Sequence, residues 1–328
     1  MSIRLSIIIP FYNVEQYIAQ CLDSVFNQDI PENEYEVICV NDASPDNSRE
    51  IVINYQTRHP NLILVEHGVN KRLGAARNTG RRIARGNYIW NVDSDDMIMP
   101  NCLGSVLCVC EQNELDVFLF SFNTLEGGKI HTRRCPWKDS SPVISGLSFW
   151  KNEAISHQSQ GAQVWTQVYR RDFLDKANIY SPEINMGEDV SFTYRSILSA
   201  DRFLTSIQPY YVWRRNDSSL MATLVKEPSP ASLYESSYIS GKLLYHTIDC
   251  IPKSEIIVRD SIRRASAHMI IKSWKSFNTL SPSSRNEFVR LIRKDFFKNL
   301  YVFKILGKKQ CVRYIKLLLF GRILSKDN

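Results

Sequence analysis

The sequence lacks the glycine-rich turns by which many enzymes bind phosphate. Neither a GxGxxG fingerprint nor a GxxxxGK[ST] loop follows any of its apolar, strand-like runs. A dinucleotide-dependent dehydrogenase or a P-loop enzyme needs such a turn, because the turn lets a phosphate approach the N-terminus of a helix. A phosphorylated ligand must therefore be held in another way, and a divalent cation bound by carboxylates is the expected substitute.

Cysteine pairs and long apolar runs are missing too. The eight cysteines form no CxxC pair, and several lie inside apolar runs, as buried free thiols do. Cys108-x-Cys110 is the nearest thing to a metal-binding fragment, but it falls in a predicted helix without partner residues, so packing is favoured. No stretch approaches the roughly 20 apolar residues of a membrane span. The N-terminal MSIRLSIIIP is too short in its apolar part for a signal peptide. These features predict a reduced, cytoplasmic protein.

What is present is a regular alternation of strand-like and helix-like segments. The 328 residues are enough for one large domain, or for a domain with an appendage. Strands are predicted at Leu5–Ile9, Glu36–Val40, Leu62–Val65 and Tyr88–Val92. Helices are predicted from Asn13, with Gln16 completing a capping box, and at Ser48–Tyr55 and Leu73–Ala84. This order predicts an α/β fold, a doubly wound, mostly parallel sheet with helices on both faces.

Three acids, Asp93, Asp95 and Asp96, follow the fourth predicted strand. A buried parallel strand carries no charge along its length, so charge collects where the strand emerges. In open α/β sheets the ligand crevice lies at that carboxyl end. Acids there suit a divalent cation that holds a phosphorylated ligand. An isolated DxD is more often a solvated turn, and only the neighbouring motifs reverse this preference.

The ends of the first and second predicted strands should adjoin these acids. Tyr12 can stack on a planar base, since an aromatic face needs no hydrogen-bond code. Asp42 can accept a hydrogen bond from a ring N–H. Taken singly, Tyr12 is equally well a packing residue and Asp42 a turn former. Together they outline a nucleotide pocket.

Three stretches together resemble the N-terminal half of the family-2 glycosyltransferases of bacterial surface-polysaccharide type. They are LSIIIPFYNVEQYIAQCLDSVFNQ, EVICVNDASPDNS and NKRLGAARNTGRRIARGNYIWNVDSDD, and they cover most of residues 4–100 in the order and spacing of that family. The resemblance implies the GT-A fold, a Rossmann-like fold that binds nucleotide-diphosphate sugars. It departs from the family at Asn41 and Ala43, where many members have the Asp and Gly of DDGS. These differences can alter the turn but leave Asp42 in place.

The resemblance also implies roles for single residues. Pro10 and Tyr12 would line the base site, and Asp42 would read the base. Asp93 would contact the ribose, and Asp95 would bind the Mg²⁺ or Mn²⁺ that bridges the diphosphate. Further candidates for contact with the nucleotide sugar are Arg72, Arg77, Ser94 and Arg214, the last in the segment YYVWRRNDSS with Arg215 and Ser218. For this segment a plain edge strand with solvated arginines is an equally good interpretation.

The predicted general base comes from Glu188-Asp189, which opens a helix behind Gly187. A carboxylate at a helix N-terminus is stabilised by free backbone N–H groups, so a lone ED is normally only a helix cap. In the resembling family this ED carries the general base. We therefore assign Asp189 as the catalytic base and Glu188 as its neighbour.

The last third of the chain changes to a basic, helical pattern. From Ile251 onward there are 18 Lys and Arg against 5 Asp and Glu, a net charge of +13, whereas the first 250 residues carry −6. We predict a catalytic domain at residues 1–228, with a nucleotide-binding half (1–100) and an acceptor half (101–228), and a basic helical region at 229–328. Basic amphipathic helices can lie on an anionic membrane surface. The alternative is a helical cap with a solvated basic face. No nucleic-acid-binding motif accompanies the charge.

The function expected from the resemblance is transfer of a sugar, with inversion, from a UDP-linked donor. The acceptor would be a hydroxyl of a growing cell-surface glycan or lipid-linked oligosaccharide at the cytoplasmic face of the membrane. One alternative is a non-catalytic nucleotide-sugar or glycan-binding protein of the same fold. Another is a nucleotidyltransferase, but the basic glycine-rich loop usual in that class is absent from Pro10–Val14.

Overall fold

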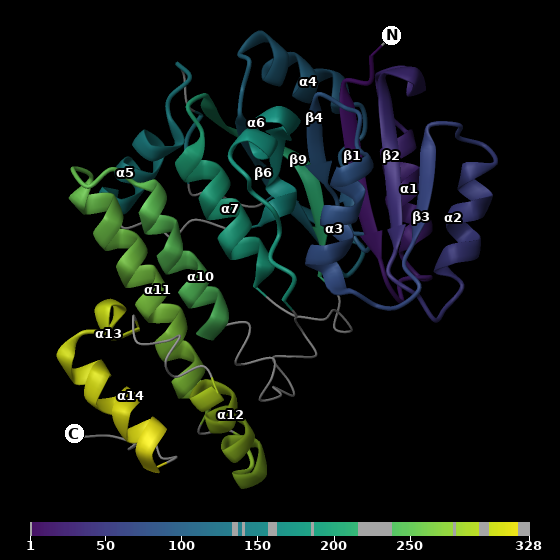
Figure 1. The fold of residues 1–328 in the computed structure, drawn as a ribbon. Coiled ribbons are helices and arrows are strands. Elements are labelled where there is room, and N and C mark those ends of the chain that lie inside the picture. The colour runs from purple at the N-terminus through teal and green to yellow at the C-terminus, as the bar shows by residue number, and fades with distance from the viewer. Residues whose placement is uncertain are drawn as a thin grey trace. The chain divides into compact units, whose positions relative to one another are not determined.

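The protein is described by a computed structural model that covers residues 2–132, 137–139, 142–156, 163–184, 187–215, 238–277, 280–294 and 302–320. The chain forms two compact units (Figure 1). The first unit comprises Met1–Glu183 and Phe192–Asn216, and the second comprises Ile184–Ser191 and Asp217–Asn328.

The described part of the first unit is organised around one mixed, nine-stranded sheet. Its strands are β1 (Leu5–Phe11), β2 (Tyr35–Asn41), β3 (Leu62–Glu66), β4 (Tyr88–Asn91), β5 (Met97–Ile98), β6 (Val117–Glu126), β7 (Lys129–Thr132), β8 (Gln167–Arg170) and β9 (Phe203–Arg214). They lie in the order β3-β2-β1-β4-β8-β6-β9-β5, with β7 paired to β6. The strands β1 to β4 are mutually parallel, and β8 is antiparallel to both β4 and β6. Since β4 and β6 are both antiparallel to β8, β6 runs in the direction of β4, and β9, which is parallel to β6, does so too. The carboxyl ends of β1 to β4, β6 and β9 therefore lie at one edge of the sheet.

The predicted α/β sheet is therefore confirmed, with an antiparallel strand, β8, inserted between β4 and β6. The described helices of this part of the chain are α1 (Ile18–Phe26), α2 (Ser48–Gln56), α3 (Arg72–Ile83), α4 (Leu103–Gln112), α5 (Gly146–Ser156), α6 (Arg171–Lys176) and α7 (Glu188–Ser199). The strands β1 and β2 are buried along their whole length, and their sequences are apolar except for Ser6, Glu36 and Asn41. The buried Glu36 carboxylate accepts hydrogen bonds from Ser6 Oγ and Arg85 Nε.

One helix start was predicted wrongly. The capping box at Asn13 and Gln16 does not form, because α1 begins only at Ile18 and Asn13 has a left-handed backbone with φ = 55°. Side chains of the loop after β2 accept the hydrogen bonds of the backbone N–H groups in this segment, in place of the predicted capping box. The Asn13 N–H donates to Ser44 Oγ at 2.7 Å, and the Glu15 N–H donates to an Asp46 carboxylate oxygen at 2.8 Å. The two loops that follow β1 and β2 are thus joined to each other.

Helix α3 lies on the sheet although its sequence is polar. Its buried residues Ala76 and Gly80 are small, so the helix backbone comes close to β1 and β2. Ala76 packs in a buried cluster with Ile8 and Ile38. A Cβ added at Gly80 would lie 2.5 Å from Cγ2 of Ile8, so this position has no room for a side chain. Helix α3 is therefore attached to the sheet by close packing of small residues, not by a broad apolar face.

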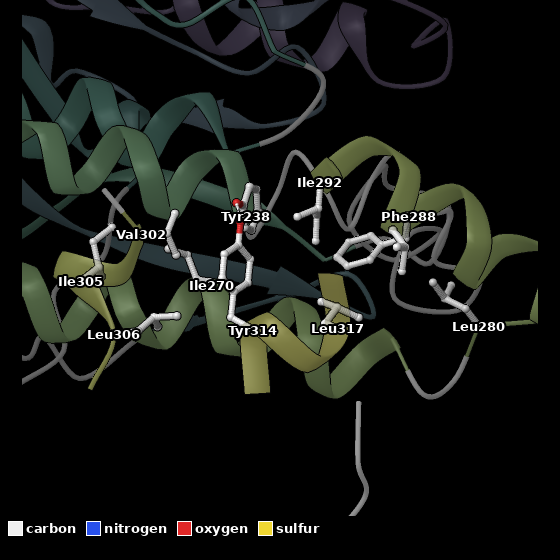
Figure 2. Close-up of a cluster of buried hydrophobic side chains, with 11 residues drawn as sticks. Tyr238, Ile270, Leu280, Phe288, Ile292, Val302, Ile305, Leu306, Tyr314 and Leu317 are labelled. Atoms are coloured by element: carbon white, nitrogen blue, oxygen red, sulfur yellow. Dashed lines mark hydrogen bonds between the residues drawn. The ribbon is translucent and has the colours of Figure 1, made fainter. Parts of the chain in front are cut away.

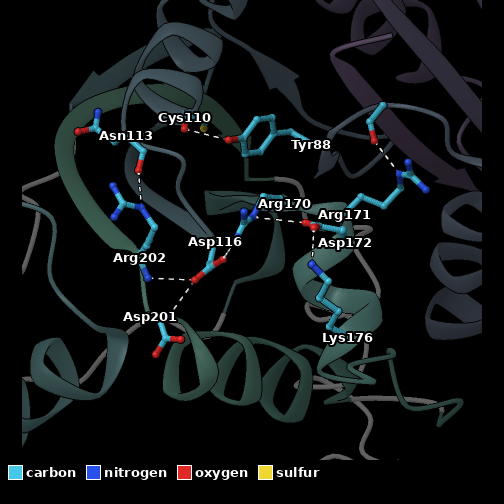
Figure 3. A network of polar contacts seen from close by, with 11 residues as sticks. Tyr88, Cys110, Asn113, Asp116, Arg170, Arg171, Asp172, Lys176, Asp201 and Arg202 are labelled. Carbon is cyan, nitrogen blue, oxygen red and sulfur yellow. Dashed lines mark hydrogen bonds and ion pairs between the residues drawn. The ribbon is translucent and has the colours of Figure 1, made fainter. Parts of the chain in front are cut away.

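The opposite edge of the sheet is fixed by Asp116, a buried acid just before β6 (Figure 3). Its carboxylate accepts hydrogen bonds from the backbone N–H groups of Asp201 and Arg202, both at 3.0 Å, and it pairs with the Arg170 side chain. These contacts join the beginnings of β6 and β9 to the end of β8. A buried carboxylate is tolerated here because each of its partners is a donor.

The second unit is helical. It contains α10 (Ser240–His246), α11 (Ile256–Phe277), α12 (Pro282–Lys294), α13 (Val302–Ile305) and α14 (Lys308–Phe320). Its core collects apolar side chains from these helices, among them Ile270, Phe288 and Leu317 (Figure 2). Within it the hydroxyl groups of Tyr238 and Tyr314 are hydrogen-bonded at 2.7 Å.

The predicted helical character of the region 229–328 is confirmed for its described residues, whereas the predicted boundary at 228/229 lies outside them. None of the helices that the structure describes is both long and apolar enough to cross a membrane.

The contact of Gly80 with Ile8 leads to a stability prediction. Replacement of Gly80 by Ala should lower the free energy of unfolding by about 1–3 kcal/mol, because α3 or the sheet must shift to admit the methyl group. Denaturant unfolding measures this change. Gly68→Ala is the matched control, since nothing lies within 4 Å of a Cβ at Gly68. Equal stabilities of the two variants would contradict the proposed packing.

Candidate functional site

The carboxyl edge of the sheet gathers most of the predicted site residues. Asp42 follows β2, the turn Asp93–Asp96 follows β4, and Arg214 is the last residue of β9. Parallel strands place their carboxyl ends together, which brings these residues to one edge although they are far apart in sequence.

Within the turn after β4, Asp93 pairs with an arginine of α3. Arg77 Nη2 lies 2.8 Å from Asp93 Oδ1, and the Arg77 side chain is 2% exposed. A buried guanidinium needs such a partner, because an isolated charge in the interior is costly. The structure therefore places Arg77 beside the acidic turn, and its contact with the nucleotide sugar stays a prediction.

The third acid of the turn, Asp96, is buried and binds donors of β9. The Tyr211 hydroxyl donates to Asp96 Oδ2 at 2.7 Å, and the Arg214 backbone N–H donates to Asp96 Oδ1 at 2.7 Å. Burial raises the pKa of Asp96 well above its ordinary value, and the nearby charges of Asp95 and Asp93 raise it further. Asp96 therefore holds the turn against β9. It is buried, whereas Asp93 and Asp95 in the same turn are half-buried.

Arg214 reaches the same turn with its side chain. Its Nε donates to the backbone carbonyl oxygen of Asp95 at 2.9 Å, and its Nη2 donates to Gln20 Oε1 at 2.6 Å. The guanidinium carbon lies 5.2 Å from the centre of the Tyr17 ring. Arg215 instead forms an exposed ion pair with Glu126. Ser218 lies outside the described residues.

Asp42 is held by three N–H donors. Its Oδ1 accepts from His67 Nδ1 at 2.6 Å and from the Lys71 N–H at 2.8 Å, and its Oδ2 accepts from the Arg72 N–H at 2.7 Å. The last two donors belong to the N-terminus of α3, where the helix dipole favours a negative charge. The contribution of Arg72 seen here is its backbone N–H, whereas its side chain is exposed.

The remaining residues of the predicted base site lie beside Asp42. Pro10 is buried in β1, and the Tyr12 side chain, 47% exposed, follows the end of that strand. Ala43 has φ = 60°, a left-handed conformation that glycine adopts more easily. The turn therefore keeps a glycine-like backbone although alanine occupies the position. Ser94 is buried inside the acidic turn.

Glu188 and Asp189 are the first two residues of α7, as predicted, and they belong to the second unit. Gly187 before them has φ = 80°, and its carbonyl oxygen accepts a hydrogen bond from Ser240 Oγ at 3.4 Å. Glu188 is buried and Asp189 is half-buried. Their place at a helix N-terminus is confirmed, and their catalytic role stays a prediction.

A metal ion at this edge would need ligands from its substrate. Among the described residues no group of three or more His, Cys, Asp or Glu side chains could hold a metal. Mg²⁺ in phosphate-processing sites is commonly bound by one or two carboxylates, with phosphate oxygens and water as the other ligands. The half-buried Asp95, in a turn where neighbouring acids raise the pKa of Asp96, fits this donor set.

The sequence did not reveal the roles of Tyr211 and His67. Tyr211 lies in β9 and His67 directly follows β3. Neither a tyrosine nor a histidine indicates by its type which residue it will contact. Tyr211 is separated from Asp96 by 115 positions, and His67 from Asp42 by 25. The one sequence feature that could have pointed to these roles is that each polar side chain lies close to the end of a strand at the predicted ligand-binding edge.

Tyr211 should be the residue that keeps the acidic turn in place. Its hydroxyl also accepts a hydrogen bond from the Asp93 N–H at 3.2 Å, while its ring stacks on Trp165. Tyr211→Phe keeps the stacking and removes both hydrogen bonds. We expect the free energy of unfolding to fall by about 1–3 kcal/mol, because buried polar groups lose their partner.

Tyr210→Phe is the matched control for that denaturation experiment. The Tyr210 hydroxyl lies 3.0 Å from Ser105 Oγ at an exposed position. Its loss should change stability by less than about 0.5 kcal/mol. A Tyr211→Phe protein as stable as the Tyr210→Phe protein would show that the link between β9 and the acidic turn is unimportant.

Comparison with known proteins was made on both sequence and fold. The family model described as glycosyl transferase family 2 matches residues 6–175. The uncharacterized glycosyltransferase EpsJ of Bacillus subtilis is 32% identical over 217 residues, which cover 66% of this chain and 62% of EpsJ. The Staphylococcus aureus poly(ribitol-phosphate) beta-N-acetylglucosaminyltransferase TarS is 30% identical over 236 residues, 71% of this chain and 39% of TarS. This chain thus spans less than two thirds of either relative.

Solved structures confirm the predicted GT-A fold. The crystal structure of S. aureus TarS 1-349 in complex with UDP-GlcNAc matches with a TM-score of 0.66 at 22% identity, covering 89% of this chain and 80% of that one. The mannosyltransferase PcManGT from Pyrobaculum calidifontis, in complex with GDP-Man and Mn²⁺, matches with a TM-score of 0.52 at 16% identity, covering 98% and 88%. The family model covers slightly more than half of the chain, and the chain therefore belongs to glycosyl transferase family 2.

Proposed function

We propose that the protein is an inverting glycosyltransferase that moves a sugar from a UDP-linked donor to an acceptor hydroxyl. The observation that carries the proposal is the convergence of Asp42, Asp93 and Asp95 with Arg77 and Arg214 at one edge of the sheet. Carboxylates and guanidinium groups together suit a nucleoside diphosphate, whose base and ribose offer donors and whose phosphates carry negative charge.

The donor would be bound in three parts. Tyr12, exposed after β1, stacks on the base, and the Asp42 carboxylate accepts a hydrogen bond from the ring N–H. Asp93 contacts the ribose. Asp95 holds Mg²⁺ or Mn²⁺, which when bound neutralises the charge of the leaving diphosphate. Arg77 and Arg214 add positive charge beside the acidic turn.

Asp189 would act as the general base, with Glu188 beside it. A carboxylate that accepts the proton of the acceptor hydroxyl increases the nucleophilicity of its oxygen. That oxygen attacks the anomeric carbon from the face opposite the diphosphate. A single displacement inverts this carbon, and no sugar–enzyme bond is formed.

The proposed acceptor is a growing cell-surface glycan or a lipid-linked oligosaccharide at the cytoplasmic face of the membrane. The proposal is supported by TarS, which resembles this chain and is named for transfer to the polymer poly(ribitol-phosphate). In the second unit, α14 buries Tyr314 and Leu317 and exposes Val312 and Ile315 beside Lys308. Residues three and four apart share one helix face, so the exposed face is apolar with a cationic flank, as in membrane-surface helices.

Two substitutions test the chemistry. Asp95→Ala should lower sugar transfer by removing the metal ligand, and Asp189→Asn should lower it by removing the base, each by about 10²–10⁴-fold with the fold retained. The assay measures transfer and donor hydrolysis across nucleotide sugars, with Mn²⁺ and with a chelator. We expect wild-type activity with Mn²⁺ and none with the chelator.

Asp201→Ala and Asp260→Asn are the controls for these variants, because Asp201 is exposed, the Asp260 side chain is 43% exposed, and neither is a predicted site residue. Both variants should leave transfer unchanged. Full activity of Asp189→Asn would remove Asp189 from the mechanism. Metal-dependent binding of UDP without transfer or hydrolysis would instead identify a non-catalytic binding protein. Release of pyrophosphate from a nucleoside triphosphate and a sugar phosphate would identify a nucleotidyltransferase.

The membrane face of α14 is tested by sedimentation of the full-length protein with vesicles. Val312→Ser with Ile315→Ser should lower the fraction that pellets with anionic phosphatidylglycerol vesicles by about threefold, because apolar burial supports the attraction of the cations. Ile130→Ser with Ile207→Ser, two exposed positions of the first unit, should leave it unchanged. Equal pelleting of both double variants, or no pelleting of the wild type, would refute membrane contact through α14.

A further inference from the structure

His67 lies at the predicted base-reading acid and has no role in the function proposed above. It follows β3, and its backbone N–H donates to the Asn41 carbonyl oxygen at 2.9 Å, which continues the pairing of β3 with β2. Its side chain is 3% exposed. The imidazole is therefore held at the end of β2, directly beside the carboxylate of Asp42.

The hydrogen bonds of His67 define which nitrogen carries the proton. A carboxylate only accepts, so the 2.6 Å contact between Nδ1 and Asp42 Oδ1 requires a hydrogen on Nδ1. In the neutral ring Nε2 is then an acceptor, and the Thr79 hydroxyl of α3 donates to it at 3.0 Å. Thr79, His67 and Asp42 form a chain of donors that ends on one oxygen of the carboxylate.

This chain leaves the two oxygens of Asp42 unequal. A carboxylate has about four acceptor positions, two on each oxygen. Within the part of the chain that the structure describes, His67 and the Lys71 N–H occupy both positions on Oδ1, whereas the Arg72 N–H occupies one position on Oδ2. With respect to these described donors, one acceptor position remains, on Oδ2. The Asp42 side chain is 6% exposed, so this position is available only to a donor that comes directly against it.

We propose that His67 is a specificity-determining positioning residue, which locks Asp42 so that Oδ2 alone receives the ring N–H of the base. Uracil carries such an N–H between its two carbonyl groups, whereas cytosine has a bare acceptor nitrogen at the same place and would oppose the carboxylate. The inference rests on the proposed binding of a nucleoside diphosphate. To that proposed function the inference adds His67 as the residue through which the base site distinguishes uracil from cytosine.

A purely structural role for His67 makes a different prediction. If the imidazole only ties the end of β3 to α3, its loss weakens folding, and any nucleotide then binds in the same proportions as before. If it orients Asp42, its loss changes the ratio of affinities for two bases of equal size. UDP and CDP differ only at the edge of the base, so their ratio separates the two roles.

The experiment measures equilibrium binding of UDP and of CDP, each with Mn²⁺, to the full-length protein by calorimetry, with melting temperature as a check of folding. The wild type should prefer UDP. His67→Leu should weaken UDP binding by about tenfold and change CDP binding by less than about twofold, because only UDP uses the hydrogen bond that the fixed carboxylate accepts. His67→Asn, whose amide N–H lies near the position of Nδ1, should restore most of the preference.

Two further variants complete the test. Thr79→Val keeps the imidazole and removes the donor to Nε2, so it should lower the preference for UDP by about threefold even if His67→Leu does not fold. His59→Leu is the matched control, since His59 contacts Glu32 at 2.7 Å before β2 and β3 begin, at the other edge of the sheet. It should leave both affinities unchanged.

The outcomes separate the inference from the function on which it rests. A wild type that binds no nucleoside diphosphate would refute the proposed function and the inference with it. A wild type that prefers UDP, with the same preference in the folded His67→Leu and Thr79→Val proteins, would refute the inference alone. A loss of preference in these two variants and not in His59→Leu would establish it.

Discussion

The buried carboxylate of Asp96 is the interaction on which the acidic edge depends. Tyr211 and the Arg214 backbone bind it from β9, and the Arg214 side chain continues to the Asp95 carbonyl oxygen. A buried carboxylate is costly unless donors surround it, so the donors of β9 must be in place whenever Asp96 is buried. The late strand β9 is therefore held against the turn that follows β4. The two halves of the first unit share one ligand edge for this reason.

The same principle shapes the site around Asp42. The loops after β1, β2 and β3 carry their own polar side chains and would be strongly hydrated if each stood alone. Here the Asp42 carboxylate accepts hydrogen bonds from the N-terminus of α3, and the Asn13 N–H donates to Ser44 Oγ, so the loops after β1 and β2 and the start of α3 are joined by hydrogen bonds. The consequence is rigidity. A carboxylate held by three donors has little freedom to turn, which is the property that the proposed base recognition requires.

In the second unit, the question is where the apolar residues of the basic helices are placed. Its helices are strongly basic, yet their apolar residues are largely used within their own core, around Phe288 and Tyr314. Among the described residues of this unit, the large apolar side chains that stay exposed are Ile256 and Ile257 at the start of α11 and Val312 and Ile315 on α14. An amphipathic sequence therefore does not by itself decide between an internal core and a membrane surface, because both need the same periodicity. Val312 and Ile315 are exposed apolar residues on one face of α14 that the core does not explain.

The strands β1 to β4 and the acids at their ends were predictable from the sequence, because a buried parallel strand is a continuous apolar run that ends where charge begins. The family resemblance assigned Asp42, Asp95 and Asp189 their proposed roles. The capping box at Asn13 could not be excluded, because its competitors, Ser44 and Asp46, lie about 30 positions away, in the loop after β2.

Local pattern thus determined the strands β1 to β4 and the acids that follow β2 and β4 at the carboxyl edge. Tertiary structure alone decided that Asp96 is buried and bonded to Tyr211, that Arg77 pairs with Asp93, and that the His67 side chain contacts Asp42. The physical reason is that a hydrogen bond or ion pair depends on the distance between two groups in space. Residue identity states what a side chain can donate or accept, and only the packed sheet determines which partner it meets.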